Sequence, residues 1–161
     1  MGGRIIKMTE LKNCFESLGF QSVATILQTG NVVFETDAKL TGLKTIIENS
    51  VASEFHFPIK VQVYRLDRLK DIVAHSPFSP DDNHHSYVLF FENSLNKQLM
   101  REATGLDDTV DLIQAGDGVI YWRVTIGSTL SSTFAKYLAK AKYKNFNTNR
   151  NIKTLRKIID S

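Results

Sequence analysis

The stretch Gln28-Thr29-Gly30-Asn31-Val32-Val33-Phe34 decides the fold of the first part of this sequence. Gly and Asn tolerate the positive φ angles that a tight hairpin turn requires, and apolar residues lie on both sides of this turn. We therefore expect two antiparallel strands, residues 20–28 and 32–34, joined through Thr29, Gly30 and Asn31.

Helices are expected on both sides of this hairpin. Apolar residues recur at helical spacing over residues 8–18, with Thr9 as the expected N-cap. A second helix is predicted over residues 40–55, and after Pro58 the alternation of apolar and polar residues predicts a strand over residues 59–64. The predicted order of the first half is therefore α-β-β-α-β.

The second half repeats this pattern around another glycine-centred hairpin, Ala115-Gly116-Asp117-Gly118. A continuous apolar run over residues 87–91 predicts a buried strand before it. The other expected elements are a linker helix and loop over 67–85, a helix over 95–103, strands over 110–114 and 119–126, a helix capped by Ser131 and a last helix from about Asn151.

The two patterns together predict an α+β fold made of two fused ferredoxin-like (split β-α-β) halves with an extra C-terminal helix. The expected boundaries are 1–66 for the first half, 67–85 for the linker and 86–161 for the second half with its C-terminal helix. In such a unit the first strand normally lies in the middle of the sheet, and no strand is predicted before residue 8. We therefore expect either that the chain begins after a missing segment or that another strand fills the gap.

Length and composition exclude several classes of protein. The 161 residues are 42% hydrophobic and 23% charged, as is typical of one ordinary globular domain or two small ones. No apolar run approaches the roughly 18 to 20 residues of a membrane span, and no apolar segment of a secretory signal follows Met1. Cys14 is the only cysteine, which favours a reducing, cytoplasmic location, bacterial in style.

Charge is concentrated at one end of the chain. Residues 136–161 contain eight basic residues and one acidic residue, whereas the preceding 135 residues carry a net charge of −4. A polyanionic partner would therefore be expected to contact the C-terminal region. The basic residues of a weaker, nucleic-acid-binding alternative are Lys136, Lys140, Lys142, Lys144, Lys153, Arg156 and Lys157.

Two motifs resemble those of a known bacterial family, the domain of unknown function 1697. Gly2-Gly3-Arg4 followed by the hairpin motif at residues 28–34 resembles its first half, and Thr148-Asn149-Arg150-Asn151 resembles its C-terminal signature. The sequence departs from the family at Ile152, where a Trp is usual, and in lacking the opening strand that ends in Arg-Gly-Ile-Asn. The resemblance implies two ferredoxin-like halves and no established activity.

The same motifs supply the candidate anion-binding residues. Successive free N–H groups in Gly2, Gly3 and Arg4 before a helix favour an anion, and the topology predicts that Gln28 and Asn31 lie beside them. Thr148, Arg150 and Asn151 combine a hydroxyl, a fixed cation and an amide at an expected helix start. The alternatives are a plain strand-to-helix turn for the glycines, and for the C-terminal motif a helix cap with Arg150 bonded to the other half.

Other motifs point to simpler roles. Residues 81–85, Asp-Asp-Asn-His-His, contain metal-ligand types, but adjacent ligands in a loop rarely converge on one ion, so we predict no metal and no cofactor. Cys14 lies beside inward-facing residues, which favours a core thiol. Tyr121 and Arg123 share one face of a predicted strand, an arrangement that RNA-recognition sheets use for base stacking, although the aromatic-rich motif of those sheets is absent.

These observations favour a domain that binds an anionic or phosphate-bearing ligand. No motif for nucleophilic or metal-dependent catalysis occurs in the sequence. An enzyme acting on a small phosphorylated or carboxylated substrate is the first alternative, and nucleic-acid binding through the basic C-terminal region is the second. Membrane binding is not expected, and the oligomeric state does not follow from the sequence.

Overall fold

The computed structural model describes residues 5–91, 95–103, 110–140, 143 and 147–161. The chain forms two compact units: residues 1–66 with 157–161, and residues 67–156. Helices and antiparallel sheets occur in both, which confirms the predicted α+β class. In the described part of the chain, no helix is long and apolar enough to cross a membrane.

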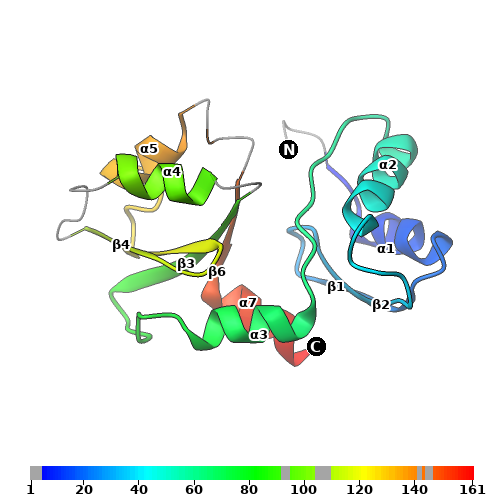
Figure 1. Cartoon of the computed structure of the whole chain (residues 1–161), viewed down its shortest axis with the longest axis horizontal. Helices are drawn as coiled ribbons and strands as arrows, with labels where there is room; N and C mark the ends of the chain where they lie inside the picture. Colours follow the sequence, from blue (N-terminus) through cyan, green and yellow to red (C-terminus); the bar gives the residue numbers. More distant parts are fainter. Residues whose placement is uncertain (1–4, 92–94, 104–109, 141–142, 144–146) are drawn as a thin grey trace. The chain divides into compact units, whose positions relative to one another are not determined.

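The first unit is built around the predicted hairpin (Figure 1). Strand β1 (Gln21–Ile26) pairs antiparallel with β2 (Asn31–Glu35), and Gly30 adopts a φ of 79° in the turn between them. Helix α1 (Met8–Ser17) packs on this hairpin through Phe15. The rings of Phe15, Phe20 and Phe34 contact one another, with centroids 4.3 to 6.0 Å apart. In chain order, the first unit thus contains α1 (Met8–Ser17), β1 (Gln21–Ile26), β2 (Asn31–Glu35) and α2 (Leu43–Phe55).

Two details at the helix starts differ from the prediction. Helix α1 begins at Met8, its N-cap is Lys7, and no side chain caps it, so Thr9 lies inside the first turn. Helix α2 begins after Gly42, whose φ of 93° reverses the chain direction there, and residues 40–42 therefore precede the helix. In both cases the apolar face was predicted correctly, since Leu11, Phe15 and Ile47 are buried.

The strand predicted over residues 59–64 is wrong as secondary structure. The segment is extended, and Ile59, Val61 and Val63 pack on the core of the first unit as a strand would. Val61, however, hydrogen-bonds to side chains of α2: its N–H donates to Glu48 Oε1 at 2.9 Å, and its carbonyl accepts from Lys44 Nζ at 2.9 Å. These side chains take the place of a ladder partner for Val61.

The second unit contains a four-stranded antiparallel sheet. Its strands lie in the order β4 (Asp111–Ala115), β5 (Val119–Thr125), β3 (His84–Phe91) and β6 (Asn147–Asn151). This is the strand order of a split β-α-β unit, with its first strand, β3, in the interior of the sheet. The duplication of this unit in the first half stays a prediction. The elements are α3 (Leu66–Ala74), β3 (His84–Phe91), α4 (Leu95–Glu102), β4 (Asp111–Ala115), β5 (Val119–Thr125), α5 (Thr133–Leu138), β6 (Asn147–Asn151) and α7 (Ile152–Asp160).

Strand β6 corrects the interpretation of the C-terminal motif. Its polar sequence was expected to be a loop ending in a helix start, but residues 147–151 pair antiparallel with β3, from Phe91 opposite Asn147 to Tyr87 opposite Asn151. Alternation of apolar residues is absent from this segment, so the sequence carried no strand signal. The neighbouring strand β3, which is buried from Val88 to Phe91, provides the pairing instead.

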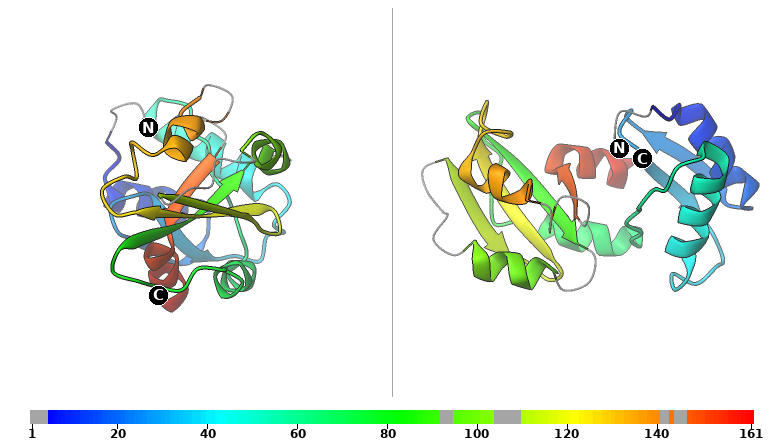
Figure 2. Two further views of the ribbon diagram at one scale, coloured as in Figure 1. Left: turned by 90° about the vertical axis from the view of Figure 1, so that its left-hand side faces the viewer. Right: turned by 90° about the horizontal axis from the view of Figure 1, so that it is seen from above.

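Helices cover both faces of this sheet (Figures 1 and 2). Helices α4 and α5 lie on one face, where Leu89, Ile120 and Trp122 form the core with Leu99 and Phe134. Helix α3 and the first part of α7 lie on the opposite face. We call this second face the α3 face; Tyr121 belongs to it, since its hydroxyl donates to the carbonyl of Ile72 in α3 at 2.6 Å.

A buried carboxylate connects the sheet to α5. Asp111 is fully buried; its Oδ1 accepts from Trp122 Nε1 at 2.8 Å, and its Oδ2 accepts from the backbone N–H of Phe134 at 3.1 Å. Ser132, not the predicted Ser131, caps this helix by accepting from the N–H of Ala135. A negative charge near the first turn of a helix is favourable, because the free N–H groups there carry positive partial charge.

Candidate functional site

The candidate anion-binding residues of the first half fall into two groups. Gly2, Gly3 and Arg4 lie outside the described residues. Gln28 is exposed in the turn after β1, whereas Asn31 is 7% exposed and its Nδ2 donates to the Ile26 carbonyl at 3.0 Å and to Thr29 Oγ1 at 2.7 Å. Asn31 therefore has a structural role, closing the hairpin.

The candidate residues of the C-terminal motif lie on opposite faces of β6. Thr148 is opposite Phe90 and Arg150 is opposite Val88, and both project to the α3 face because cross-strand partners share a face. Asn151 lies opposite Tyr87, on the other face, and its Oδ1 accepts from the N–H of Lys153. Of the three, Asn151 thus has the capping role that was considered as an alternative.

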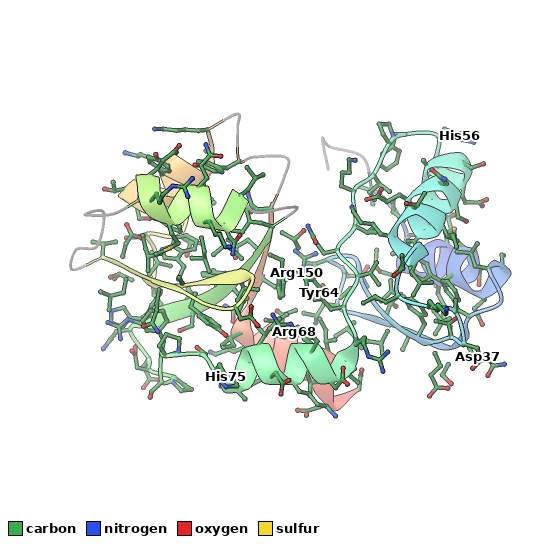
Figure 3. All side chains as sticks on the ribbon, viewed as in Figure 1. Asp37, His56, Tyr64, Arg68, His75 and Arg150 are labelled. Carbon is green, nitrogen blue, oxygen red and sulfur yellow. The ribbon has the colours of Figure 1, made fainter. Side chains whose placement is uncertain are left out.

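The side chain of Arg150, on strand β6, is half-buried (Figure 3). Its Nη1 donates to the carbonyl of Asn149 at 3.0 Å, and burial lowers the pKa of the Arg150 guanidinium. The guanidinium nevertheless remains charged at neutral pH, because the ordinary pKa of arginine exceeds 12. Arg68 of α3 lies on the same side of the sheet and is paired with Asp117, with its Nη2 3.4 Å from Oδ2.

A second arginine on the α3 face was missed as an anion-binding candidate. Arg123 of β5 lies opposite Ser86 of β3, and Phe78 lies over its guanidinium, with Cζ 5.5 Å from the ring centroid. Its Nε is buried and has no hydrogen-bond partner in the described part of the chain. The sequence placed Arg123 on one face with Tyr121, but Tyr121 is buried under α3, so the pair does not offer an open base-stacking surface.

The strand positions of the α3 face carry no carboxylate. The register assigns twelve described residues to it, with two arginines, one histidine and no Asp or Glu among them. Arg123 and Arg150 lie on the strands on either side of β3. The residues are His84, Ser86, Val88, Phe90, Leu112, Gln114, Val119, Tyr121, Arg123, Thr125, Thr148 and Arg150.

The described basic residues of the nucleic-acid alternative are divided between α5 and α7. Lys136 and Lys140 are exposed at α5, and Lys140 Nζ lies 3.9 Å from the centroid of the Tyr137 ring. Lys153 and Arg156 are exposed on α7, on the opposite side of the sheet. Lys157 is exposed on the same helix, whereas Lys142 and Lys144 lie outside the described residues.

The loop over residues 81–85 and Cys14 make local side-chain contacts. Within the described ranges, no group of three or more His, Cys, Asp or Glu residues is placed to hold a metal ion. In the loop before β3, both carboxylate oxygens of Asp81 lie 2.9 Å from His84 Nδ1, and Asp81 Oδ1 accepts from the N–H of Asn83 at 2.7 Å. The contact with His84 is the main cause that lowers the pKa of Asp81. Cys14 is buried, 3.4 Å from Ser50 Oγ.

A carboxylate with two phenol partners was also missed by the sequence analysis. Glu102 Oε2 accepts from the hydroxyls of Tyr137, at 2.8 Å, and Tyr143, and Glu102 Oε1 accepts from Gln98. Burial, followed by the hydrogen bond to Glu102, raises the pKa of Tyr143. Tyr143 is fully buried, and the cluster joins α4 to Tyr137 of α5 and to Tyr143 after it.

Comparison with known proteins agrees with this architecture. Among the solved structures, the chain resembles one described as "The structure of conserved bacterial protein SP0830 from Streptococcus pneumoniae", with a TM-score of 0.82 and 22% sequence identity. The similarity covers 99% of this chain and 91% of that one. No curated protein matches the sequence.

The sequence also matches a family described as "Protein of unknown function (DUF1697)" over residues 1–121. This match confirms the resemblance seen in the motifs of the first half. Because it extends over most of the 161 residues, the chain belongs to the DUF1697 family of proteins of unknown function.

Proposed function

We propose that the protein binds a small anionic ligand, carrying a phosphate or carboxylate group, on the α3 face of the second unit. Arg150 and Thr148 on β6 are the contacts that the sequence predicted. The observation that carries the proposal is the charge of this face: two arginines lie on either side of β3, and no described strand position of the face is acidic.

Burial makes this charge significant. A half-buried guanidinium loses part of its hydration, which is why the pKa of Arg150 is lowered. An anion beside it would add favourable interactions, and arginine binds the oxygens of carboxylates and phosphates in pairs. Thr148, two positions away on the same face, adds a hydroxyl that can donate to an anion.

The two alternatives have less support. An enzyme acting on a small phosphorylated or carboxylated substrate would use the same anion contact, but it also needs a nucleophile or a general base beside the bound group. Nucleic-acid binding would need a continuous basic surface, and the described basic residues at α5 and α7 lie on opposite sides of the sheet. The single cysteine remains consistent with the proposed cytoplasmic location.

A titration followed by amide chemical shifts tests the proposal. The chain is titrated with inorganic phosphate, AMP and succinate, and the same series is repeated on Arg150→Gln and on Arg101→Gln. Arg101 is an exposed arginine of α4, so its variant removes the same charge from a different layer. We expect at least one anion to bind to the chain and to Arg101→Gln, and to bind at least tenfold more weakly to Arg150→Gln.

Absence of binding by all three anions at millimolar concentration would overturn the proposal, as would equal affinity for both arginine variants. Should Arg150→Gln fail to fold, Thr148→Ala replaces it, because it removes only a hydroxyl from the same face. A short oligonucleotide is titrated in parallel at two salt concentrations. Steeply salt-dependent binding that is unaffected by Arg150→Gln would favour the nucleic-acid alternative instead.

A further inference from the structure

We infer that His84, Ser86, Arg123 and Thr125 form a subsite for a phosphate group, which we call the Arg123 patch. The inference rests on the proposed function and deepens it, since it names both the group recognised and residues that no sequence motif indicated. The patch occupies one end of the α3 face, near the loop that precedes β3.

The register of β3 and β5 brings the four side chains together. His84 lies opposite Thr125 and Ser86 lies opposite Arg123, so the residues form a two-by-two group on one face of the sheet. Directly opposite side chains have Cβ atoms roughly 4.5 to 5.5 Å apart. All four are half-buried, in contrast to the neighbouring Val88 and Phe90 of the same face, which are buried. Solvent therefore reaches this end of the face.

The guanidinium of Arg123 is held in place, but its hydrogen-bond donors have no acceptor among the described residues. The Phe78 ring lies over its guanidinium, which limits the orientation of the side chain. No described residue makes a hydrogen bond or an ion pair to this guanidinium, and Nε is buried without an acceptor. Buried donors are nearly always hydrogen-bonded in native proteins, so such an atom requires an explanation. An oxyanion bound at the terminal nitrogens would supply acceptors to the rest of this unsatisfied guanidinium.

The neighbouring groups favour an anion of tetrahedral shape. The guanidinium offers its N–H groups in one plane, whereas Ser86 and Thr125 project hydroxyls from other strand positions. When two phosphate oxygens lie in the plane of the guanidinium, the other oxygens lie outside that plane, where these hydroxyls can donate to them. A carboxylate has only two oxygens, and both lie in one plane. The patch therefore fits a phosphate group better than a carboxylate.

His84 completes the patch, and its ring contacts the carboxylate of Asp81. Its Nδ1 faces the Asp81 carboxylate, so Nε2 is the ring nitrogen left for another partner. Asp81 also accepts a hydrogen bond from the backbone N–H of Asn83, so it has a structural role in the loop. The carboxylate is thus engaged by His84 and by the loop backbone, not by Arg123.

The test compares phosphate with acetate on matched variants. Inorganic phosphate, glycerol 3-phosphate and acetate are titrated into the full chain, Arg123→Gln, Ser86→Ala and Arg101→Gln, with amide shifts of residues 84–86 and 123–125 as the readout. We expect phosphate to bind at least tenfold more weakly to Arg123→Gln and at least threefold more weakly to Ser86→Ala, with Arg101→Gln unchanged. Acetate should bind the full chain more weakly than phosphate. Tighter binding of glycerol 3-phosphate than of free phosphate would assign the subsite to a monoester.

The outcomes separate this inference from the proposed function. If phosphate binding is lost in Arg150→Gln but retained in Arg123→Gln and Ser86→Ala, the Arg123 patch is overturned and the proposed function stands. If neither phosphate nor any other anion binds the full chain, both are overturned. The fluorescence of Trp122, the only tryptophan, shows whether each variant is folded in the second unit. If Arg123→Gln does not fold, Ser86→Ala decides the question.

Discussion

The two units hold an extended segment in different ways: the one after α2 in the first unit and the one after α5 in the second. In the second unit, residues 147–151 form β6 and pair along their whole length with β3. In the first unit, the segment over 59–64 is extended and packs on the core, but Val61 is held by Lys44 and Glu48 of α2. The polar segment 147–151 becomes a strand because a neighbouring strand pairs with it. The alternating apolar segment 59–64 does not, because side chains of α2 hydrogen-bond to the backbone of Val61 instead.

The largest effect is expected from the buried carboxylate of the second unit. Asp111→Ala should lower the free energy of unfolding of that unit by about 3 kcal/mol, because it leaves the buried donors Trp122 Nε1 and Phe134 N–H without acceptors. Denaturant unfolding followed by Trp122 fluorescence measures this change. Asp82→Ala, in an exposed loop position, is the control and should change stability by less than about 0.5 kcal/mol. Equal effects of the two substitutions would contradict the assigned role of Asp111.

The contrast between the units is tested directly at Glu48. Glu48→Gln should destabilise the first unit by about 1 kcal/mol, because a neutral amide oxygen accepts more weakly than a carboxylate from Lys44 and from the N–H of Val61. Burial acts to raise the pKa of Glu48, but these hydrogen bonds outweigh it and lower the pKa, so the bonds stabilise the charged form. Hydrogen exchange at Val61 should accelerate. Glu54→Gln, an exposed position of α2, should leave that exchange rate unchanged.

Alkaline pH should affect the two units unequally. Burial raises the pKa of Tyr143 and of Tyr121, both in the second unit, so the folded state keeps these phenols protonated after the unfolded chain has begun to ionise. Their stabilising contribution is therefore complete below pH 10 and is lost as the pH rises further, by about 1.4 kcal/mol per pH unit for each group.

Replacement of one phenol makes this expectation specific. Tyr143→Phe should reduce the steepness of the pH dependence above pH 10, with Trp122 fluorescence as the measurement. The substitution should also lower stability at pH 7 by about 1 kcal/mol, through loss of the hydrogen bond to Glu102. An unchanged slope above pH 10 would show that Tyr143 does not titrate as its burial indicates.

The smallest effect concerns the two hairpins, in which the units are most alike. Gly30 and Gly118 have φ angles of 79° and 74°, a region that residues with a Cβ rarely adopt. Each Gly→Ala substitution should destabilise its own unit by about 1 kcal/mol, without an effect on the other unit. Hydrogen exchange resolved by residue distinguishes the two. If Gly30→Ala were neutral while Gly118→Ala was not, the hairpins would not be equivalent.

Much of the fold followed from local patterns. The hairpin at residues 28–34, the apolar face of α1 and the buried strand β3 were predicted, because turn chemistry and hydrophobic periodicity are properties of a few neighbouring residues. The N-cap at Thr9 was wrong, since several residues near a helix start can cap it and the choice depends on where packing begins the helix. Strand β6 was missed for a related reason: its residues carry no strand pattern of their own.

The candidate site shows the same division. The sequence by itself determined that Arg150 and Thr148 are polar residues two positions apart, and that Arg123 shares a strand face with Tyr121. Only the tertiary structure decided that α3 covers Tyr121, that Asn31 and Asn151 are engaged in a turn and a cap, and that Arg123 lies beside Ser86. The physical reason is that strand pairing joins residues far apart in the chain, and no local pattern encodes which strands will be neighbours.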